Sequence, residues 1–149
     1  MTDEAYMRIC LEEAERAGVG GEVPIGALVV RDGVVLGQAG NRSITACDPT
    51  AHAEIVALRI AAIAAHNHRL TGADVFATVE PCMMCVGALL QARVRRIVFG
   101  CRDPKAGFLG SVADFSNEPR LNHRLVVLGG VCSDEAAELL RQFFRRRRM

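Results

Sequence analysis

The stretch ADVFATVEPCMMCVGALLQARVRRIVFGC, Ala73 to Cys101, decides the fold class because two apolar runs flank one helical segment. ADVFATV reads as a short strand, Pro81 opens a helix that runs to about Arg93, and RRIVFGC is the next strand. A helix that joins two such strands is typical of a parallel pair covered on one face. The stretch therefore predicts an α/β protein.

The sequence on both sides of this unit extends the pattern. An amphipathic helix is expected over Asp3–Ala17, and IGALVVRDGVVLGQAG is a hairpin signal that turns at Asp32-Gly33. A further helix is expected from Ala51 to about Ala65. After a long loop, the strand RLVVLG leads into a last helix, from Ser133 to the arginine tail. We predict a single domain, residues 1–149, that folds as a three-layer α/β/α sandwich with a central mixed sheet of about five strands.

Composition places the chain among globular proteins of the cell interior. Half of its 149 residues are apolar and 23% are charged. No apolar run approaches the roughly 20 residues that cross a bilayer, so no membrane association is expected. The acidic start MTDEAYMRIC does not read as a secretory signal. A cytoplasmic location follows, where a close pair of cysteines indicates metal binding or catalysis more often than a disulfide.

Charge is unevenly distributed along the chain. Residues 1–90 hold 6 basic and 11 acidic groups, whereas residues 91–149 hold 12 basic and 6 acidic groups. The basic excess in the second part indicates a polyanionic partner. The plainer interpretation is a folded surface on which the two parts interleave, and charge alone favours that interpretation.

Cys82 and Cys85 are three residues apart at the predicted helix start behind Pro81, so their thiols lie on one face. The free N–H groups and the dipole at a helix start favour thiolate over thiol. Two thiolates can chelate an ion such as zinc, but a thioredoxin-like redox pair also occupies a helix start. C-x-x-C alone does not decide between the two.

A second predicted helix start supplies a candidate third metal ligand. DPTAHAE delivers His52 and Glu54, with Asp48 or Thr50 as a plausible cap. One histidine and two cysteines provide three ligands, and a fourth position left to water is typical of catalytic zinc. A closed structural site is the alternative, and its candidate fourth ligands are Cys47, Cys101, His66, His68 and His123.

Glu54 lies about 200° around an ideal helix from His52, which makes it a poor ligand on the same face. A carboxylate that borders the same pocket can instead take a proton from water and pass it to substrate. The simpler role is an acid that complements the helix dipole, and that role is favoured when Glu54 is considered alone.

Together, H-x-E followed by P-C-x-x-C is the signature of zinc-dependent nucleobase deaminases. Along almost its whole length the chain resembles the family of bacterial tRNA-specific adenosine deaminases. The matching stretches are EVPIGALVV, DPTAHAEIVALR, EPCMMCVGALLQARVRRIVFGCRDPKAG, Gly110-Ser111, LNHR and LLRQFFRRRR.

The resemblance implies the cytidine-deaminase-like fold, a homodimer and one Zn²⁺ per subunit. It implies hydrolysis of the wobble adenosine of a tRNA anticodon loop to inosine, by zinc-bound hydroxide, with release of ammonia. His52, Cys82 and Cys85 are then the zinc ligands, and Glu54 carries the protons. The resemblance also implies that Asn41 contacts the flipped base.

Two basic segments are candidates for binding the tRNA anticodon stem-loop. Arg102, Asp103 and Lys105 lie in the long loop, where we expect them to line a nucleic-acid groove, although a solvated turn would also explain them. The tail could contact stem phosphates or simply complement the dipole at a helix end. Its four residues are Arg145, Arg146, Arg147 and Arg148.

Two other functions compete with tRNA editing. A small-molecule guanine or cytosine deaminase would share the zinc motif but is not expected to share the FGCRDPKAG loop together with the FFRRRR tail. A non-catalytic zinc-stabilised module, or the inactive partner of a catalytic subunit, would have no use for Glu54. The bulky pair Phe108-Leu109 departs from the small residues expected in the family and could reshape the rim of the groove.

Overall fold

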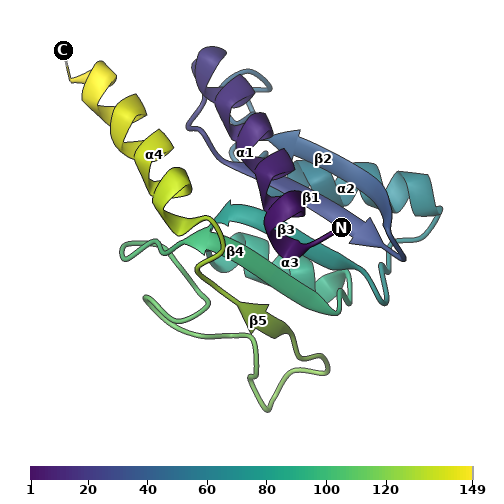
Figure 1. Cartoon of the computed structure of the whole chain (residues 1–149). Helices are drawn as coiled ribbons and strands as arrows, with labels where there is room; N and C mark the ends of the chain where they lie inside the picture. Colours follow the sequence, from purple (N-terminus) through teal and green to yellow (C-terminus); the bar gives the residue numbers. More distant parts are fainter. Residues whose placement is uncertain (149) are drawn as a thin grey trace.

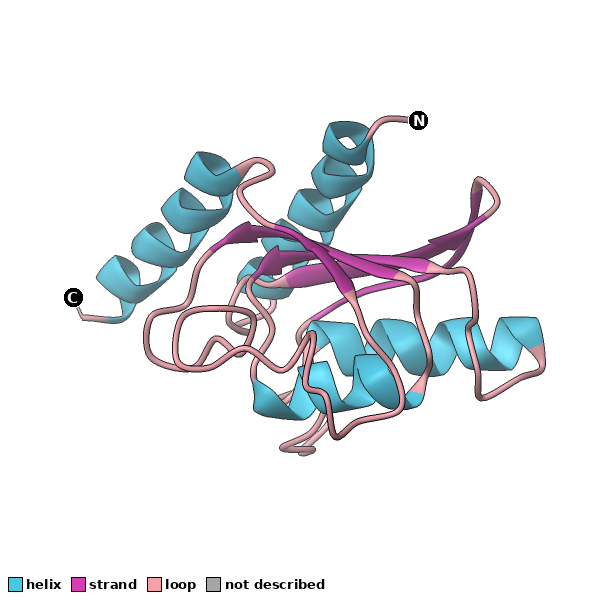
Figure 2. Ribbon diagram, turned by 90° about the horizontal axis from the view of Figure 1, so that it is seen from below, coloured by secondary structure: helices cyan, strands magenta, loops and turns pink. Residues whose placement is uncertain are grey.

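The chain folds into a five-stranded sheet with two helices on each face (Figures 1 and 2). The structure is a computed structural model and describes residues 1–148. Helices α1 (Asp3–Val19) and α4 (Ser133–Arg147) cover one face, and α2 (Ala53–Ala65) and α3 (Met83–Gln91) cover the other. The strands are β1 (Gly26–Arg31), β2 (Val34–Gly40), β3 (Asp74–Val79), β4 (Arg96–Cys101) and β5 (Val126–Leu128).

The strand order is β2-β1-β3-β4-β5, with antiparallel pairing in the first part and parallel pairing in the second. Strand β1 runs antiparallel to both β2 and β3. Strands β3, β4 and β5 run parallel. Val79 at the end of β3 pairs with Cys101 at the end of β4, so the segments that follow these two strands leave the sheet side by side.

Alternation along the strands divides the core into two layers. Ala27 and Val29 pack against α2 and α3, whereas Leu28 and Val30 pack against α1. This follows from the two-residue period of a strand, which sends successive side chains to opposite faces. Both layers are apolar, and the sheet is therefore buried on both sides.

The predicted fold class and element order are confirmed, and four elements differ clearly from their predicted bounds. Helix α1 continues through Gly18 to Val19, because a single glycine in the last turn weakens a helix without ending it. Helix α2 begins at Ala53 rather than Ala51. Helix α3 covers Met83–Gln91, shorter at both ends than the predicted helix. The last strand is reduced to Val126–Leu128, at the edge of the sheet with β4 as its one neighbour.

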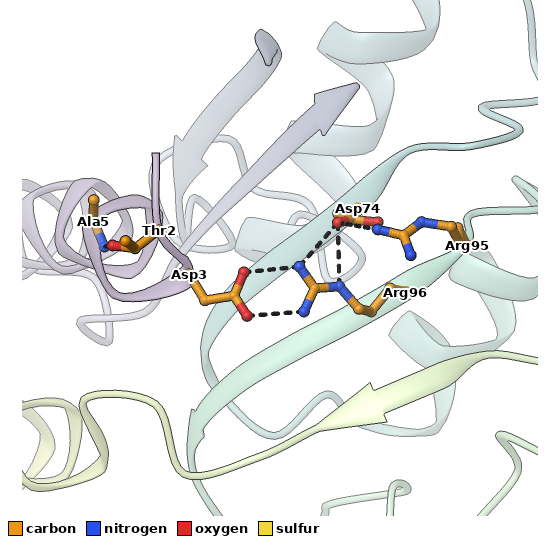
Figure 3. A network of polar contacts seen from close by, with 6 residues as sticks. All are labelled: Thr2, Asp3, Ala5, Asp74, Arg95 and Arg96. Carbon is orange, nitrogen blue, oxygen red and sulfur yellow. Dashed lines mark hydrogen bonds and ion pairs between the residues drawn. The ribbon is translucent and has the colours of Figure 1, made fainter. Parts of the chain in front are cut away.

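A network of charges fastens the start of α1 to the sheet (Figure 3). Arg96 on β4 donates to both carboxylate oxygens of Asp3, at 2.8 Å each, and to Asp74 Oδ2 at 3.0 and 3.1 Å. Arg95 donates to the same Asp74 oxygen at 2.7 Å. These contacts hold the first residue of α1 beside the first residues of β3 and β4. Within residues 1–148, no helix is both long and apolar enough to span a membrane.

Candidate functional site

Three side chains from two helix starts form a cluster suited to a metal ion. His52 Nδ1 lies 3.6 Å from Cys82 Sγ and 3.6 Å from Cys85 Sγ. The ligand atoms of all three residues lie within 4.8 Å of one another. Within residues 1–148 this is the one group of three or more histidine, cysteine or acidic side chains with such spacing.

The spacing fits Zn²⁺. Bond lengths of about 2.05 Å to nitrogen and 2.3 Å to sulfur at a tetrahedral angle place the two ligand atoms about 3.6 Å apart. Both nitrogen–sulfur distances have this value. The chemistry of the cluster also fits, since thiolate and imidazole are the ligands that zinc prefers. The cluster includes none of the candidate fourth ligands, so three protein ligands would leave one position open.

The two helices present these residues through their N-caps. His52 is the N-cap of α2 and Cys82 is the N-cap of α3, both with extended backbone, and Cys85 lies in the first turn of α3. Pro81 therefore precedes the cap instead of occupying the first helical turn. Neither Asp48 nor Thr50 caps α2, because the Asp48 carboxylate accepts from the N–H and hydroxyl of Thr50.

The protonation of the cluster reflects its proximity and burial. A hydrogen bond with Cys85 lowers the pKa of Cys82 to about 4, helped by His52 and opposed by burial. The same hydrogen bond, together with burial, raises the pKa of Cys85. The hydrogen bond with Cys82 raises the pKa of His52. The contacts of Cys82 with Cys85 and His52 thus favour a thiolate at Cys82, the form that binds metal.

Glu54 borders the cluster from inside the protein. The residue is 4% exposed, and burial raises its pKa above the ordinary value of a glutamate. Its carboxyl group interacts with the Cys85 thiol and with His52. A buried carboxyl group with a raised pKa beside a metal-competent cluster has the properties of a proton carrier.

Asn41 follows β2 and lies in the loop that returns to His52. Its N–H donates to Ile25 O at 3.0 Å, and the N–H of Arg42 donates to Ala51 O at 2.9 Å. These bonds bring the end of β2 next to the residue that precedes His52. The structure therefore places Asn41 on the side of the cluster where the α2 helix begins.

A groove of about 810 Å³ lies between α4 and the loop that follows β4. Val79 and Ile25 form part of its floor. The groove is strongly basic, with Asp103 as the one acidic residue among those that line it. Its cationic residues are Arg102, Lys105, Arg141, Arg145, Arg147 and Arg148.

Arg146 departs from the expected arrangement of the tail. It lines a neighbouring hollow of about 430 Å³ between α1 and α4, and its Nε donates to Gln142 O. Arg147 lines both hollows; it stacks over the Phe143 ring at 4.8 Å and donates to Gly21 O. Successive helical residues project in different directions, so one face of α4 cannot present all four arginines.

The loop after β4 both lines the groove and forms an ordered turn. Asp103 Oδ1 accepts from the N–H groups of Lys105 and Ala106, so one oxygen of this carboxylate stabilises the turn. Leu109 is 4% exposed and packs in the core, and Phe108 packs edge-on against Phe115. The bulky pair therefore fills the interior behind the loop more than it shapes the rim.

Two buried acids next to the site were missed by sequence reasoning. Glu22 accepts from the N–H groups of Ile44 and Thr45 and from the Thr45 hydroxyl, which orders the loop after Asn41. Glu80, directly before Pro81, is 3% exposed and bonds to the loop after β4. The only signal for Glu80 was an acidic residue between an apolar strand and a Pro-Cys pair.

Comparisons with known proteins agree with this geometry. Residues 1–101 match the family model of the cytidine and deoxycytidylate deaminase zinc-binding region. The chain is 46% identical over 144 residues to the tRNA-specific adenosine deaminase of Agrobacterium fabrum, covering 97% of this chain and 95% of the relative. A solved tRNA:A34 deaminase superimposes with a TM-score of 0.88 at 44% identity, covering 91% and 99% of the two chains. The guanine deaminase of Nitrosomonas europaea superimposes with a TM-score of 0.79 at 25% identity, covering 95% and 84%.

Proposed function

Because the chain belongs to the zinc-binding cytidine and deoxycytidylate deaminase family, we propose that it hydrolyses adenosine to inosine at the wobble position of a tRNA anticodon loop. The observation that carries the proposal is a metal-competent cluster next to a basic groove. One loop connects the two features, since Gly107 forms a bridge with Cys82 and Arg102 and Lys105 of the same loop line the groove. The likeness to tRNA-specific adenosine deaminases supports the choice of substrate.

We propose that His52, Cys82 and Cys85 hold one Zn²⁺ per subunit. Two thiolates and a neutral imidazole balance the charge of the ion, which suits a site that is partly buried. When bound, the ion supplies a hydroxide nucleophile at neutral pH by lowering the pKa of a coordinated water. The N-cap positions of His52 and Cys82 fix the direction from which the two helices present their ligands.

Glu54 is proposed to carry the protons of the reaction. It takes a proton from the attacking water and gives it to N1 of adenine while the C6–O bond forms. A second transfer to the 6-amino group lets the C6–N bond break and ammonia leave. Water and adenosine are consumed, inosine and ammonia are formed, and Glu54 ends in its starting state. Its burial keeps bulk water away from this exchange.

The groove residues are proposed to hold the RNA. The target base must leave its stack, which costs least in a single-stranded loop such as the anticodon. Cations that line the groove would neutralise the flanking phosphates. The cations proposed for this role are Arg102, Lys105, Arg145, Arg147 and Arg148, and Asp103 lines the same groove. Asn41, whose N–H donates to Ile25 O beside the groove, is proposed to contact the extruded base.

A guanine deaminase is the second candidate, because the Nitrosomonas europaea enzyme has the same fold at 25% identity. A small-molecule enzyme has no need of a groove with six cations and one acidic side chain. A non-catalytic zinc module would leave the buried Glu54 without a role. The groove therefore favours RNA editing over a small-molecule reaction, and Glu54 favours an enzyme over a non-catalytic module.

We further propose a homodimer, formed through the outer face of α2 and α3. Ile63 and Ile60 on α2 are 75% and 44% exposed, and Met83 on α3 is 60% exposed. An apolar hollow of about 420 Å³ lies between the same helices, which is the kind of surface that dimer interfaces bury. We also propose that residues 1–149 act as one domain in the cytoplasm, in keeping with six free cysteines among the residues described.

The decisive experiment supplies matched substrates to the zinc-loaded protein. An anticodon stem-loop with adenosine at the wobble position is compared with the same stem-loop carrying guanosine there, and with free adenosine, guanine and cytosine. Inosine and ammonia are measured together. We expect one ammonia per inosine from the adenosine stem-loop alone. Release of ammonia confined to free guanine or cytosine would replace this function with the second candidate.

A further inference from the structure

Glu80 lies between strand β3 and the Pro81-Cys82 pair, and its side chain has no exposed surface. Its carboxylate accepts four hydrogen bonds. Oε1 accepts from Asp103 N at 3.1 Å and from the Ser111 hydroxyl. Oε2 accepts from Leu109 N at 3.0 Å and from Ser111 N at 3.1 Å.

All four donors belong to one loop, residues 102–111. Asp103 stands at one end of the loop, and Leu109 and Ser111 stand at the other, so the carboxylate closes the loop around itself. Gly107 passes directly over it. A Cβ at position 107 would lie 2.2 to 2.4 Å from the carboxylate atoms of Glu80, a distance that forces the carboxylate to move.

The inner side of the same loop contacts the metal-binding segment. Phe108 N donates to Pro81 O at 2.9 Å, and Gly107 forms an antiparallel bridge with Cys82. The outer side carries Arg102, Asp103 and Lys105, which line the basic groove. One loop therefore separates the cysteine ligand from the cationic wall, and its shape sets the distance between them.

We infer that Glu80 is a positioning residue that holds the substrate-binding loop 102–111 at a fixed place relative to the metal-binding segment 81–85. The substrate part of this inference rests on the proposed function, because it takes the outer side of the loop to be an RNA contact. The geometric part rests on the four hydrogen bonds and the packing of Gly107 alone. Glu80 acts through the loop and touches neither metal nor base.

A carboxylate suits this task better than an amide. Every partner of Glu80 is a donor, and a glutamine would replace one accepting oxygen with an NH₂ group that faces two donors. Such a replacement removes at least one of the four bonds, because only the Ser111 hydroxyl can turn to accept from the NH₂ group, and it leaves a buried N–H group without a partner. The loop should then shift or fluctuate while the strand beneath it, β3, stays in the sheet.

The test is Glu80→Gln, with zinc content, amide hydrogen exchange and steady-state kinetics on the stem-loop as readouts. We expect full zinc content, faster exchange confined to residues 103–111, and KM raised about tenfold with kcat changed less than about threefold. Glu12→Gln is the matched control, since Glu12 is exposed on α1 and its replacement removes the same charge.

Gly107→Ala is the second variant, because it displaces the carboxylate without changing its chemistry. It should reproduce the loop exchange and the KM of Glu80→Gln, and the double variant should be no worse than either alone. Gly20→Ala is its control: the added Cβ meets only ordinary contacts, at 3.5 Å or more. Gly107→Ala also carries the test if Glu80→Gln does not fold.

The possible results test the role of Glu80 and the proposed function separately. Unchanged exchange of residues 103–111 in both variants overturns the inference. Loss of zinc, or a fall in kcat with KM unchanged, also overturns it, because Glu80 would then act on the metal-binding segment or on the chemistry. If the unaltered protein forms no inosine, the proposed function fails, whereas the exchange measurement still tests whether Glu80 holds the loop.

Discussion

Glu22 and Thr45 form a two-pronged contact in which one carboxylate oxygen accepts from both the backbone N–H and the hydroxyl of the threonine, each at 2.6 Å. The second oxygen accepts from Ile44 N at 3.1 Å. Glu22 itself is 3% exposed. This contact orders the loop between Asn41 and His52. The acid that holds the loop lies more than 20 residues before Thr45 in the chain.

The Glu22 contact should make stability depend on pH in acid. Burial acts to raise the pKa of Glu22, but the bonds from Thr45 and Ile44 and the charge of Arg42 outweigh it and lower the pKa below the ordinary 4.5. A lowered pKa stabilises the folded state above the ordinary value, and this contribution is lost as pH falls through the folded-state pKa. We expect Glu22→Gln to cost about 2 kcal/mol of unfolding free energy at pH 7.

Urea unfolding of both proteins between pH 3 and pH 7 checks this. The difference between the unaltered protein and Glu22→Gln should be constant above about pH 5 and should shrink below the ordinary pKa. A difference that grows on acidification would mean that burial, and not hydrogen bonding, dominates the titration of Glu22.

Glu54→Gln should separate metal binding from turnover. The amide keeps the size of the buried side chain but cannot carry a proton, so we expect full zinc content and a kcat lower by about 10²- to 10⁴-fold. Metal analysis and inosine formation are measured on the same preparation. Cys82→Ser is the contrasting variant, expected to lose zinc and activity together. Zinc loss in Glu54→Gln would instead make Glu54 a ligand.

The arginines of α4 should differ in their effect on RNA binding. Arg145 and Arg148 line the basic groove, whereas Arg146 lines the hollow on the other side of the helix. Replacing both groove arginines with alanine should reduce the slope of log Kd against log salt by about 2, since each phosphate contact contributes about 1. Arg146→Ala should change the slope by less than half of one contact. Titrations of a labelled stem-loop from 50 to 300 mM salt, over which the Debye length falls by more than half, measure both slopes.

Arg96→Met should destabilise the fold and leave the site intact. The guanidinium joins Asp3 and Asp74, whose side chains are largely shielded from water, and Asp74 Oδ1 already has no partner among the described residues. Removing the cation leaves Asp3 without this partner and Asp74 with Arg95 alone, which we expect to cost about 1 to 3 kcal/mol of unfolding free energy. Denaturant unfolding and zinc content are the measurements. Equal stability of the two proteins would show that the network in Figure 3 contributes nothing net.

Local sequence patterns predicted the element order because each element has its own period and its own boundary residues. The Asp32-Gly33 hairpin and the unit from Ala73 to Cys101 were visible in this way. The order β2-β1-β3-β4-β5 was not, since it depends on which strand edges meet after collapse. The start of α3 was placed too early because a proline before a helix fits both the first turn and the residue before the cap.

The site residues also divide into those that the sequence predicts and those that it does not. His52, Cys82 and Cys85 could be grouped because their residue types and spacing imply one ion. Glu22 and Glu80 could not be found, because a buried acid that bonds to loop N–H groups has no sequence signature of its own. The direction of each arginine side chain on α4 was equally inaccessible, since it follows from how the helix rotates against the sheet.

The pairing of Val79 with Cys101 has an evolutionary consequence. Strands β3 and β4 run parallel, and their last residues pair with each other. The segment that holds Cys82 and Cys85 and the loop 102–111 therefore begin at neighbouring positions on one edge of the sheet. Lengthening or exchanging the loop after Cys101 would alter what the protein accepts, while the segment after Val79 keeps its ligands in place. A scaffold of this kind lets selection retune substrate choice without rebuilding the reaction chemistry.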